Sequence, residues 1–124
     1  MAYPSSTKTQ LALSICRDLI FSSKISGAAR NAGWVSRSVR SLEDLHKGLA
    51  EKPAFVLLDL NITGLDVAAA ISAVQATEPA PNLIGYFSHV ETESAREARR
   101  LGVGEIYARS KFVQILPELF SPLE

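Results

Sequence analysis

The stretch Phe55-Val56-Leu57-Leu58-Asp59-Leu60-Asn61 places large apolar residues directly before a carboxylate. This run is short and lies between Pro53 and Gly64, a pattern that favours a strand buried on both faces over a helix. Asp59 then lies at the carboxyl end of a parallel strand, the edge of an open α/β sheet where ligands bind. Because a buried carboxylate is costly without a partner, this position indicates a functional group. The alternative is an Asp that caps the following helix or turn.

The rest of the chain alternates strand and helix patterns around this stretch. Strands are predicted over residues 10–16, 34–39, 54–60, 83–87 and 105–108. Helical patterns follow each of them, with Asp18 and Ser41 as the predicted N-caps of the first two helices. The alternation predicts an α/β fold: a doubly wound, flavodoxin-like three-layer sandwich with a five-stranded parallel sheet in the order 2-1-3-4-5.

Length and charge limit the classes of function. The 124 residues suit one domain, predicted over 9–124, with a flexible N-terminal tail over 1–8. Thirteen basic residues balance thirteen acidic ones, so the overall charge favours neither nucleic acid nor an anionic membrane as a partner. The first forty residues are nevertheless basic, with Asp18 their only acid and these cations: Lys8, Arg17, Lys24, Arg30, Arg37 and Arg40.

The cysteine count, the apolar stretches and the absence of nucleotide-binding motifs limit the cellular compartment and the possible chemistry. The single cysteine, Cys16, excludes an internal disulfide, and no apolar stretch has the length of a membrane span, so we expect a cytoplasmic protein. It has neither the Gly-x-Gly-x-x-Gly pattern after the first strand nor a Gly-Lys-Ser/Thr phosphate loop. Ser88 and His89 are adjacent in sequence and hence poorly placed to act as nucleophile and base. We therefore expect no enzymatic activity.

Four features together resemble the receiver domain of bacterial response regulators over nearly the whole chain. They are Val56-Leu57-Leu58-Asp59, a hydroxyl residue after the fourth strand, Leu101-Gly102-Val103, and a cation after the fifth strand. The resemblance implies a CheY-like module of two-component (phosphorelay) systems, in which Asp59 would accept a phosphoryl group from a histidine kinase. It also implies that Ser88 and the cation contact that group.

Two residues compete for the place of the family's lysine after the fifth strand. Counting without gaps from Gly102 gives Arg109, which we prefer. Lys111 is the alternative, because Lys111-Phe112 is similar to the family's Lys-Pro-Phe, but it requires an insertion. Either cation would lower the pKa of Asp59, and Arg has the better geometry for a bidentate contact.

The largest departure from the family lies after the first strand. Receivers place two acids there to hold Mg²⁺, and the corresponding residues here are Cys16 and Arg17. A thiol is a poor Mg²⁺ ligand, and a guanidinium repels the ion. Asp18 would replace at most one ligand, so any Mg²⁺ site formed with Asp59 would be weak and no cofactor is expected.

The departures predict an atypical receiver, or pseudo-receiver, that acts through protein contact without normal Mg²⁺-dependent phosphorylation. The alternative is a phosphorylatable receiver that uses Asp59 with a degraded metal site. Partners would be a histidine kinase or a downstream effector. The resemblance also implies a partner or homodimer surface on the fourth helix, fifth strand and fifth helix, around Val90, Arg96, Tyr107 and Phe112.

Overall fold

The structure is a computed structural model that describes residues 9–88 and 93–120. The predicted tail over 1–8 and the residues His89 and Val90 lie outside this part of the chain. The elements are β1 (Thr9–Ile15), α1 (Leu19–Asn31), β2 (Val35–Ser38), α2 (Leu42–Leu49), β3 (Pro53–Asp59), α3 (Val67–Gln75), β4 (Asn82–Phe87), α4 (Glu93–Arg100), β5 (Glu105–Ala108) and α5 (Arg109–Leu119). No helix within the described ranges has the length and apolarity needed to cross a membrane.

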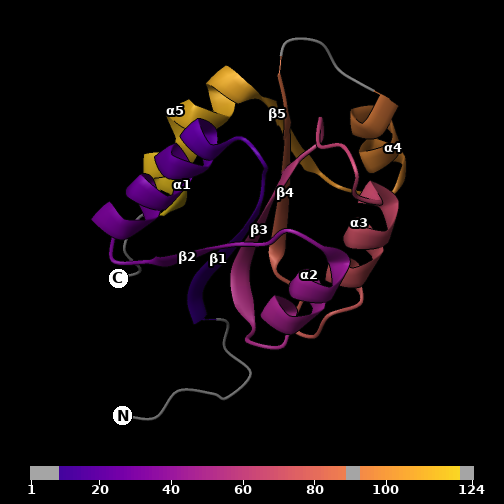
Figure 1. Cartoon of the computed structure of the whole chain (residues 1–124), viewed down its shortest axis with the longest axis horizontal. Coiled ribbons are helices and arrows are strands. Elements are labelled where there is room, and N and C mark those ends of the chain that lie inside the picture. The colour runs from indigo at the N-terminus through magenta and orange to yellow at the C-terminus, as the bar shows by residue number, and fades with distance from the viewer. Residues whose placement is uncertain (1–8, 89–92, 121–124) are drawn as a thin grey trace.

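The strands form one parallel sheet in the order β2-β1-β3-β4-β5. Helices α1 and α5 cover one face of the sheet, and α2, α3 and α4 cover the other (Figure 1). The predicted α/β class, strand order and three layers are therefore confirmed. Each predicted strand end lies within one residue of the observed end.

The central strand β3 is the most deeply buried part of the sheet. Val56, Leu57 and Leu58 have almost no exposed surface, because helices cover both faces of a parallel sheet. Alternate residues enter different layers: Val56 and Leu58 pack with the α2 and α3 side, while Leu57 packs with Ile25 on the α1 and α5 side. Two apolar layers thus fix the direction of β3 and the position of Asp59 at its end.

Side-chain caps define where the helices begin. The Asp18 carboxylate accepts hydrogen bonds from the backbone N–H groups of Ile20 and Phe21 at 3.0 and 3.1 Å. The Ser41 hydroxyl accepts from the Asp44 N–H at 3.1 Å. Both predicted caps are confirmed, and each satisfies backbone donors that a helix leaves without partners in its first turn.

An aromatic cluster fills the layer between the sheet and α5. The Tyr86 ring stacks on Phe112 with 4.5 Å between ring centroids and lies 5.0 Å from the Phe21 ring. Burial, together with the neighbouring Cys16 thiol, raises the pKa of Tyr86. Phe112 is 0% exposed, so its predicted place on an exposed partner surface is wrong. The first turn of α5 directs this ring onto the sheet, where it buries more apolar area than it would on the surface.

Gly85 in β4 allows the sheet to approach the side chain of Leu60. A Cβ atom at Gly85 would lie 2.8 Å from Leu60 Cδ1 and 3.2 Å from Leu60 Cγ. Leu60 is itself buried. We expect Gly85→Ala to lower the free energy of unfolding by about 1–3 kcal/mol, because overpacking displaces neighbouring core atoms. Denaturant unfolding measures this change.

Gly27→Ala is the matched control. Gly27 lies in α1, and a Cβ placed there would have no atom within 4 Å apart from its chain neighbours and the backbone of the helix itself. Alanine at this position should raise the free energy of unfolding by about 0.5–1 kcal/mol, because glycine is the poorer helix former. Equal effects of the two substitutions would show that the Leu60 contact does not constrain the sheet.

Candidate functional site

Four segments bring polar side chains to the carboxyl edge of the sheet. Asp18 follows β1, and Asp59 ends β3. Ser88 and Arg109 lie beyond β4 and β5, each two residues after a member of the register pair Tyr86 and Tyr107. The parallel arrangement therefore places these side chains at one edge although they are far apart in the sequence.

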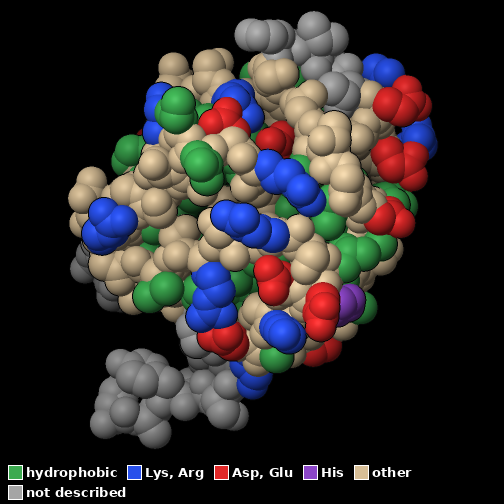
Figure 2. All heavy atoms as spheres, viewed as in Figure 1, with side chains coloured by type: hydrophobic (Ala, Val, Ile, Leu, Met, Phe, Trp, Pro, Cys, Tyr) green, Lys and Arg blue, Asp and Glu red, His purple; other side chains and the backbone are tan. Residues whose placement is uncertain are grey.

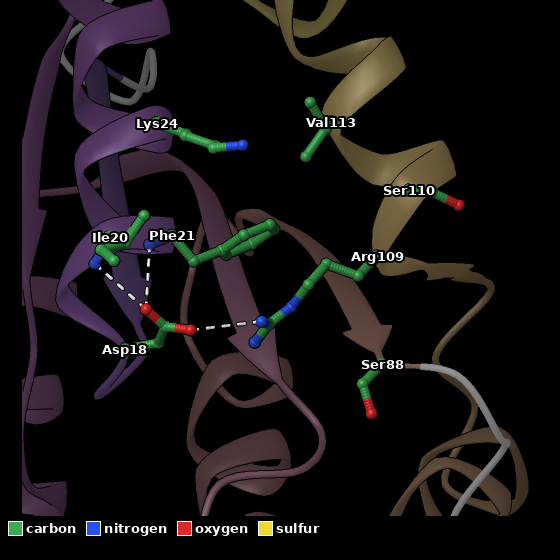
Figure 3. Close-up of a pocket in the computed structure, with 8 residues that line it drawn as sticks. All are labelled: Asp18, Ile20, Phe21, Lys24, Ser88, Arg109, Ser110 and Val113. Atoms are coloured by element: carbon green, nitrogen blue, oxygen red, sulfur yellow. Dashed lines mark hydrogen bonds and ion pairs between the residues drawn. The ribbon is translucent and has the colours of Figure 1, made fainter.

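Arg109 lies between the two carboxylates. One guanidinium nitrogen, Nη1, is 3.3 Å from Asp18 Oδ2, and the other, Nη2, is 3.7 Å from Asp59 Oδ2. The guanidinium carbon lies 4.2 Å from the centroid of the Phe21 ring. Figure 3 shows the side chain reaching from the start of α5, past this ring, toward Asp18. An apolar surface and two anions thus hold one cation in place.

Burial dominates the electrostatics of Asp59. Asp59 is only 6% exposed, and this burial raises the pKa of its carboxyl group. The Asn61 N–H, which donates to Asp59 Oδ1 at 2.9 Å, and the charge of Arg109 act in the opposite direction but are smaller effects. The charge of Asp18 raises the pKa slightly further. The charge of Arg109 therefore does not fully compensate Asp59 for its loss of contact with water.

Asp18 is exposed to solvent, and its pKa is lowered, whereas that of Asp59 is raised. The N–H of Phe21 is the main cause of its lowered pKa, and Arg109 contributes through both its charge and its hydrogen bond. The predicted cap and the predicted weak metal ligand are thus the same carboxylate, and it is already used by α1 and Arg109. A metal ion bound through Asp18 would therefore compete with these contacts.

The residues at this edge do not fit a Mg²⁺ site. Cys16 is buried and directs its thiol to the carbonyl of Asp18 at 3.6 Å. Arg17 donates through Nη2 to the carbonyl oxygen of Arg40 at 3.3 Å. Within residues 9–88 and 93–120, no three His, Cys, Asp or Glu side chains lie close enough to hold a metal ion together. Two carboxylates separated by a guanidinium are a poor site for a hard divalent cation.

The remaining predicted site residues lie at different distances from this cluster. Ser88 is half-buried beside it, and its backbone N–H donates to the side-chain oxygen of Asn61 at 2.7 Å. Lys111 is exposed on α5, and in the described residues it forms no ion pair with Asp59. Of the two candidate cations, Arg109 is the one that the structure brings to Asp59. Whether it fills the family's functional role stays a prediction.

Sequence reasoning missed Asn61 and Lys24 as residues of this edge. Asn61 connects the ends of β3 and β4, and its position two residues after Asp59 was the available signal. Lys24 lines a cavity of about 600 Å³ beside the cluster. Figure 3 shows the cavity between α1 and α5, with these lining residues: Asp18, Ile20, Phe21, Lys24, Ser88, Arg109, Ser110 and Val113.

The raised pKa of Asp59 predicts a specific dependence of stability on pH. A folded state with a raised carboxyl pKa binds more protons than the unfolded chain between the two pKa values, so stability falls as the pH rises through that window. We expect Asp59→Asn to raise the free energy of unfolding at neutral pH by about 1 kcal/mol. The advantage should shrink as the pH falls toward about 4, the pKa of an unperturbed Asp.

Asp66→Asn is the control for this experiment. Asp66 is an exposed N-cap whose carboxylate accepts from the Ala69 N–H, and Asn caps helices about as well as Asp. This variant should be nearly neutral. If Asp59→Asn is instead destabilising at neutral pH, the attraction to Arg109 outweighs the cost of burial.

No family model and no curated protein sequence match the chain. Solved structures do match. The signal receiver domain of a DNA-binding response regulator from Colwellia psychrerythraea 34H has a TM-score of 0.68 at 18% identity, over 88% of this chain and 96% of that one.

Two further solved structures are similar to a comparable degree. The phosphorylated cyanobacterial phytochrome response regulator RcpA has a TM-score of 0.70 at 15% identity, over 90% of this chain and 91% of that one. The beryllofluoride-activated NtrC4 receiver domain dimer has a TM-score of 0.68 at 16% identity, over 91% of this chain and 100% of that one. The chain therefore has the fold of response-regulator receiver domains.

Proposed function

We propose that this protein is a receiver-like signalling module that acts through protein contact and does not use normal Mg²⁺-dependent phosphorylation. The observation that carries this proposal is the position of Arg109, with one nitrogen 3.3 Å from Asp18 and the other 3.7 Å from Asp59. A guanidinium is charged at all physiological pH values. The protein thus supplies from its own chain the positive charge that receivers obtain from a metal ion.

The positive charges near Asp59 explain why a metal ion would bind there poorly. A divalent cation next to Asp59 would have to displace Arg109 or lie beside its positive charge, and repulsion at such distances is strong where water is excluded. Arg17, at the position of a receiver acid, adds a second cation near the same strand end. Displacing Arg109 would also remove its contact with the Phe21 ring. Each of these costs favours the metal-free state.

A phosphorylatable receiver is the second candidate, and one observation favours it. Asp59 and Ser88 remain at neighbouring strand ends, and Asn61 connects them by accepting a hydrogen bond from the Ser88 N–H and donating its own N–H to Asp59. A phosphoryl group on Asp59 would then lie near a hydroxyl and near Arg109, whose fork suits such a group. The two candidates differ in whether Mg²⁺ and a phosphoryl mimic change the site.

The discriminating experiment is a titration with Mg²⁺ and beryllofluoride, a mimic of a phosphoryl group, followed by amide NMR. We expect the amide signals of Asp59, Asn61 and Ser88 to stay unchanged. About 10 mM Mg²⁺ should move the thermal midpoint by less than about 1 °C, since a ligand stabilises only when its concentration exceeds its dissociation constant. Saturable shifts at these three amides would favour the phosphorylatable receiver.

Introducing the two receiver acids at positions 16 and 17 tests the role of Arg109 in excluding Mg²⁺. We expect the double variant Cys16→Asp, Arg17→Asp to bind Mg²⁺ weakly, because Arg109 still neutralises Asp59. Adding Arg109→Lys should strengthen Mg²⁺ binding about tenfold or more, because the shorter hydrated cation no longer bridges two carboxylates. Calorimetry measures both affinities.

The control is the triple variant Cys16→Asn, Arg17→Asn, Arg109→Lys. Its side chains at residues 16 and 17 supply oxygen atoms without negative charge. This variant should gain little affinity for Mg²⁺. Equal affinities of the double and triple variants would show that Arg109 is not the barrier to metal binding.

The partner surface that we propose comprises α4, β5 and α5, as a contact for a second copy of this chain. On α4, Arg96 pairs with Glu93 and Arg100 with Glu97, and these side chains remain substantially exposed. Tyr107 on β5 is half-buried and packs against the aromatic layer that contains Tyr86. Exposed charges on α4 and a partly buried aromatic residue on the edge strand β5 are the kinds of rim and core residues that protein interfaces combine. A kinase or an effector would be alternative partners for the same surface.

Charge reversal tests this surface. Arg96→Glu with Arg100→Glu should weaken self-association about tenfold, because it places four acids on α4. The matched control is Arg30→Glu with Arg37→Glu, which also breaks one exposed ion pair, with Glu51, on the opposite side of the fold. Light scattering over a range of concentrations gives the dimer dissociation constants. Equal losses would indicate only diffuse electrostatics, and a protein that stays monomeric at millimolar concentration would exclude the homodimer.

A further inference from the structure

A second cavity lies on the other side of the first turn of α1. It encloses about 280 Å³ and is lined by Cys16, Arg17, Leu19, Ser22, Ser38 and Arg40. These residues come from the segment after β1, from α1, and from the end of β2 and the segment that follows it. None of them belongs to the cluster of Asp18, Arg109 and Asp59, so the cavity is a separate feature of the same sheet edge.

Two arginines give this cavity a strong positive charge. In the described part of the chain, no carboxylate forms an ion pair with either Arg17 or Arg40. Arg17 uses one nitrogen to donate to the Arg40 carbonyl at 3.3 Å. The Asp44 carboxylate accepts from the Arg40 backbone N–H at 3.4 Å. Figure 2 shows Lys and Arg side chains gathered in the middle of this face, above the end of β2.

The lining supplies the donors that a phosphate group requires. An arginine has five N–H donors in a planar fork, so Arg17 and Arg40 retain most of theirs for a ligand. Ser22 and Ser38 add two hydroxyl groups to the lining. Arginine forks form paired, charge-assisted hydrogen bonds to phosphate oxygens. The cavity is close to the lower end of the range for small-molecule sites, about 300 Å³, and thus suits one compact anionic group.

Charge and shape together specify the ligand. A phosphate monoester carries a charge of about −1.5 to −2 at neutral pH, which balances two guanidinium groups, whereas a carboxylate would balance only one. Leu19 borders the cavity and is 75% exposed, so it offers an apolar surface to the group that the phosphate esterifies. We propose that this cavity binds the phosphate group of a small monoester, with Arg17 and Arg40 as its principal contacts.

Amide NMR titrations test this proposal on the whole chain. Inorganic phosphate, added at constant ionic strength, should give saturable shifts at the amides of Ser22, Ser38 and Arg40. Phenyl phosphate should bind more tightly, because its ring can lie against Leu19. Acetate should bind at least about tenfold more weakly than phosphate, since it balances one charge fewer. Equal affinities for acetate and phosphate would overturn the proposal, and equal affinities for the two phosphates would overturn its monoester part.

Single substitutions then assign the contacts. Arg17→Gln and Arg40→Gln should each weaken phosphate binding about tenfold, as expected for the loss of a charged hydrogen-bond donor. Arg30→Gln is the matched control, because it removes the same charge from an exposed position on α1 that does not line the cavity. Its affinity should equal that of the unchanged protein. Unchanged amide spectra of β3 and β4 show that each variant is folded, and equal losses in all three variants would overturn the proposal.

Discussion

β3 is buried on both faces, and this burial determines the surroundings of the carboxylate at its end. Helices cover the sheet from both sides, so Val56, Leu57 and Leu58 lose nearly all contact with water. The strand therefore ends with its last residue, Asp59, still largely buried. A carboxylate in that position needs a compensating donor or cation. The Asn61 N–H and the Arg109 guanidinium meet that requirement in part, and the pKa of Asp59 remains raised.

Arg109 contacts two carboxylates and an aromatic ring at the same time, so the geometry of its guanidinium matters as well as its charge. Its fork reaches Asp18 and Asp59 with different nitrogens, while its planar face lies over Phe21. A lysine ammonium is a point charge and would not combine these contacts. The guanidinium packs on the aromatic layer formed by Phe21, Tyr86 and Phe112, through the rings of Phe21 and Tyr86. The same packing that buries Phe112 thus also positions the charge at the site.

Two adjacent residues after β1 serve different sides of the sheet edge. Asp18 turns toward Arg109 and caps α1, whereas Arg17 turns toward Arg40. The first turn of α1 separates the two directions: Ile20, Phe21 and Lys24 line one cavity, and Leu19 and Ser22 line the other. One edge therefore holds two carboxylates that share one guanidinium, beside a region where two arginines form no ion pair within the described residues.

Local sequence patterns predicted the alternation of strands and helices, the sheet order, the caps at Asp18 and Ser41, and the place of Asp59 at a buried strand end. Those features follow from local periodicity and from the few ways of winding a parallel sheet. The patterns did not predict that Asp18 and Asp59 share one guanidinium, that Arg17 contacts Arg40, or that Phe112 points inward. Such contacts join residues far apart in the chain, and they depend on side-chain directions that periodicity does not specify.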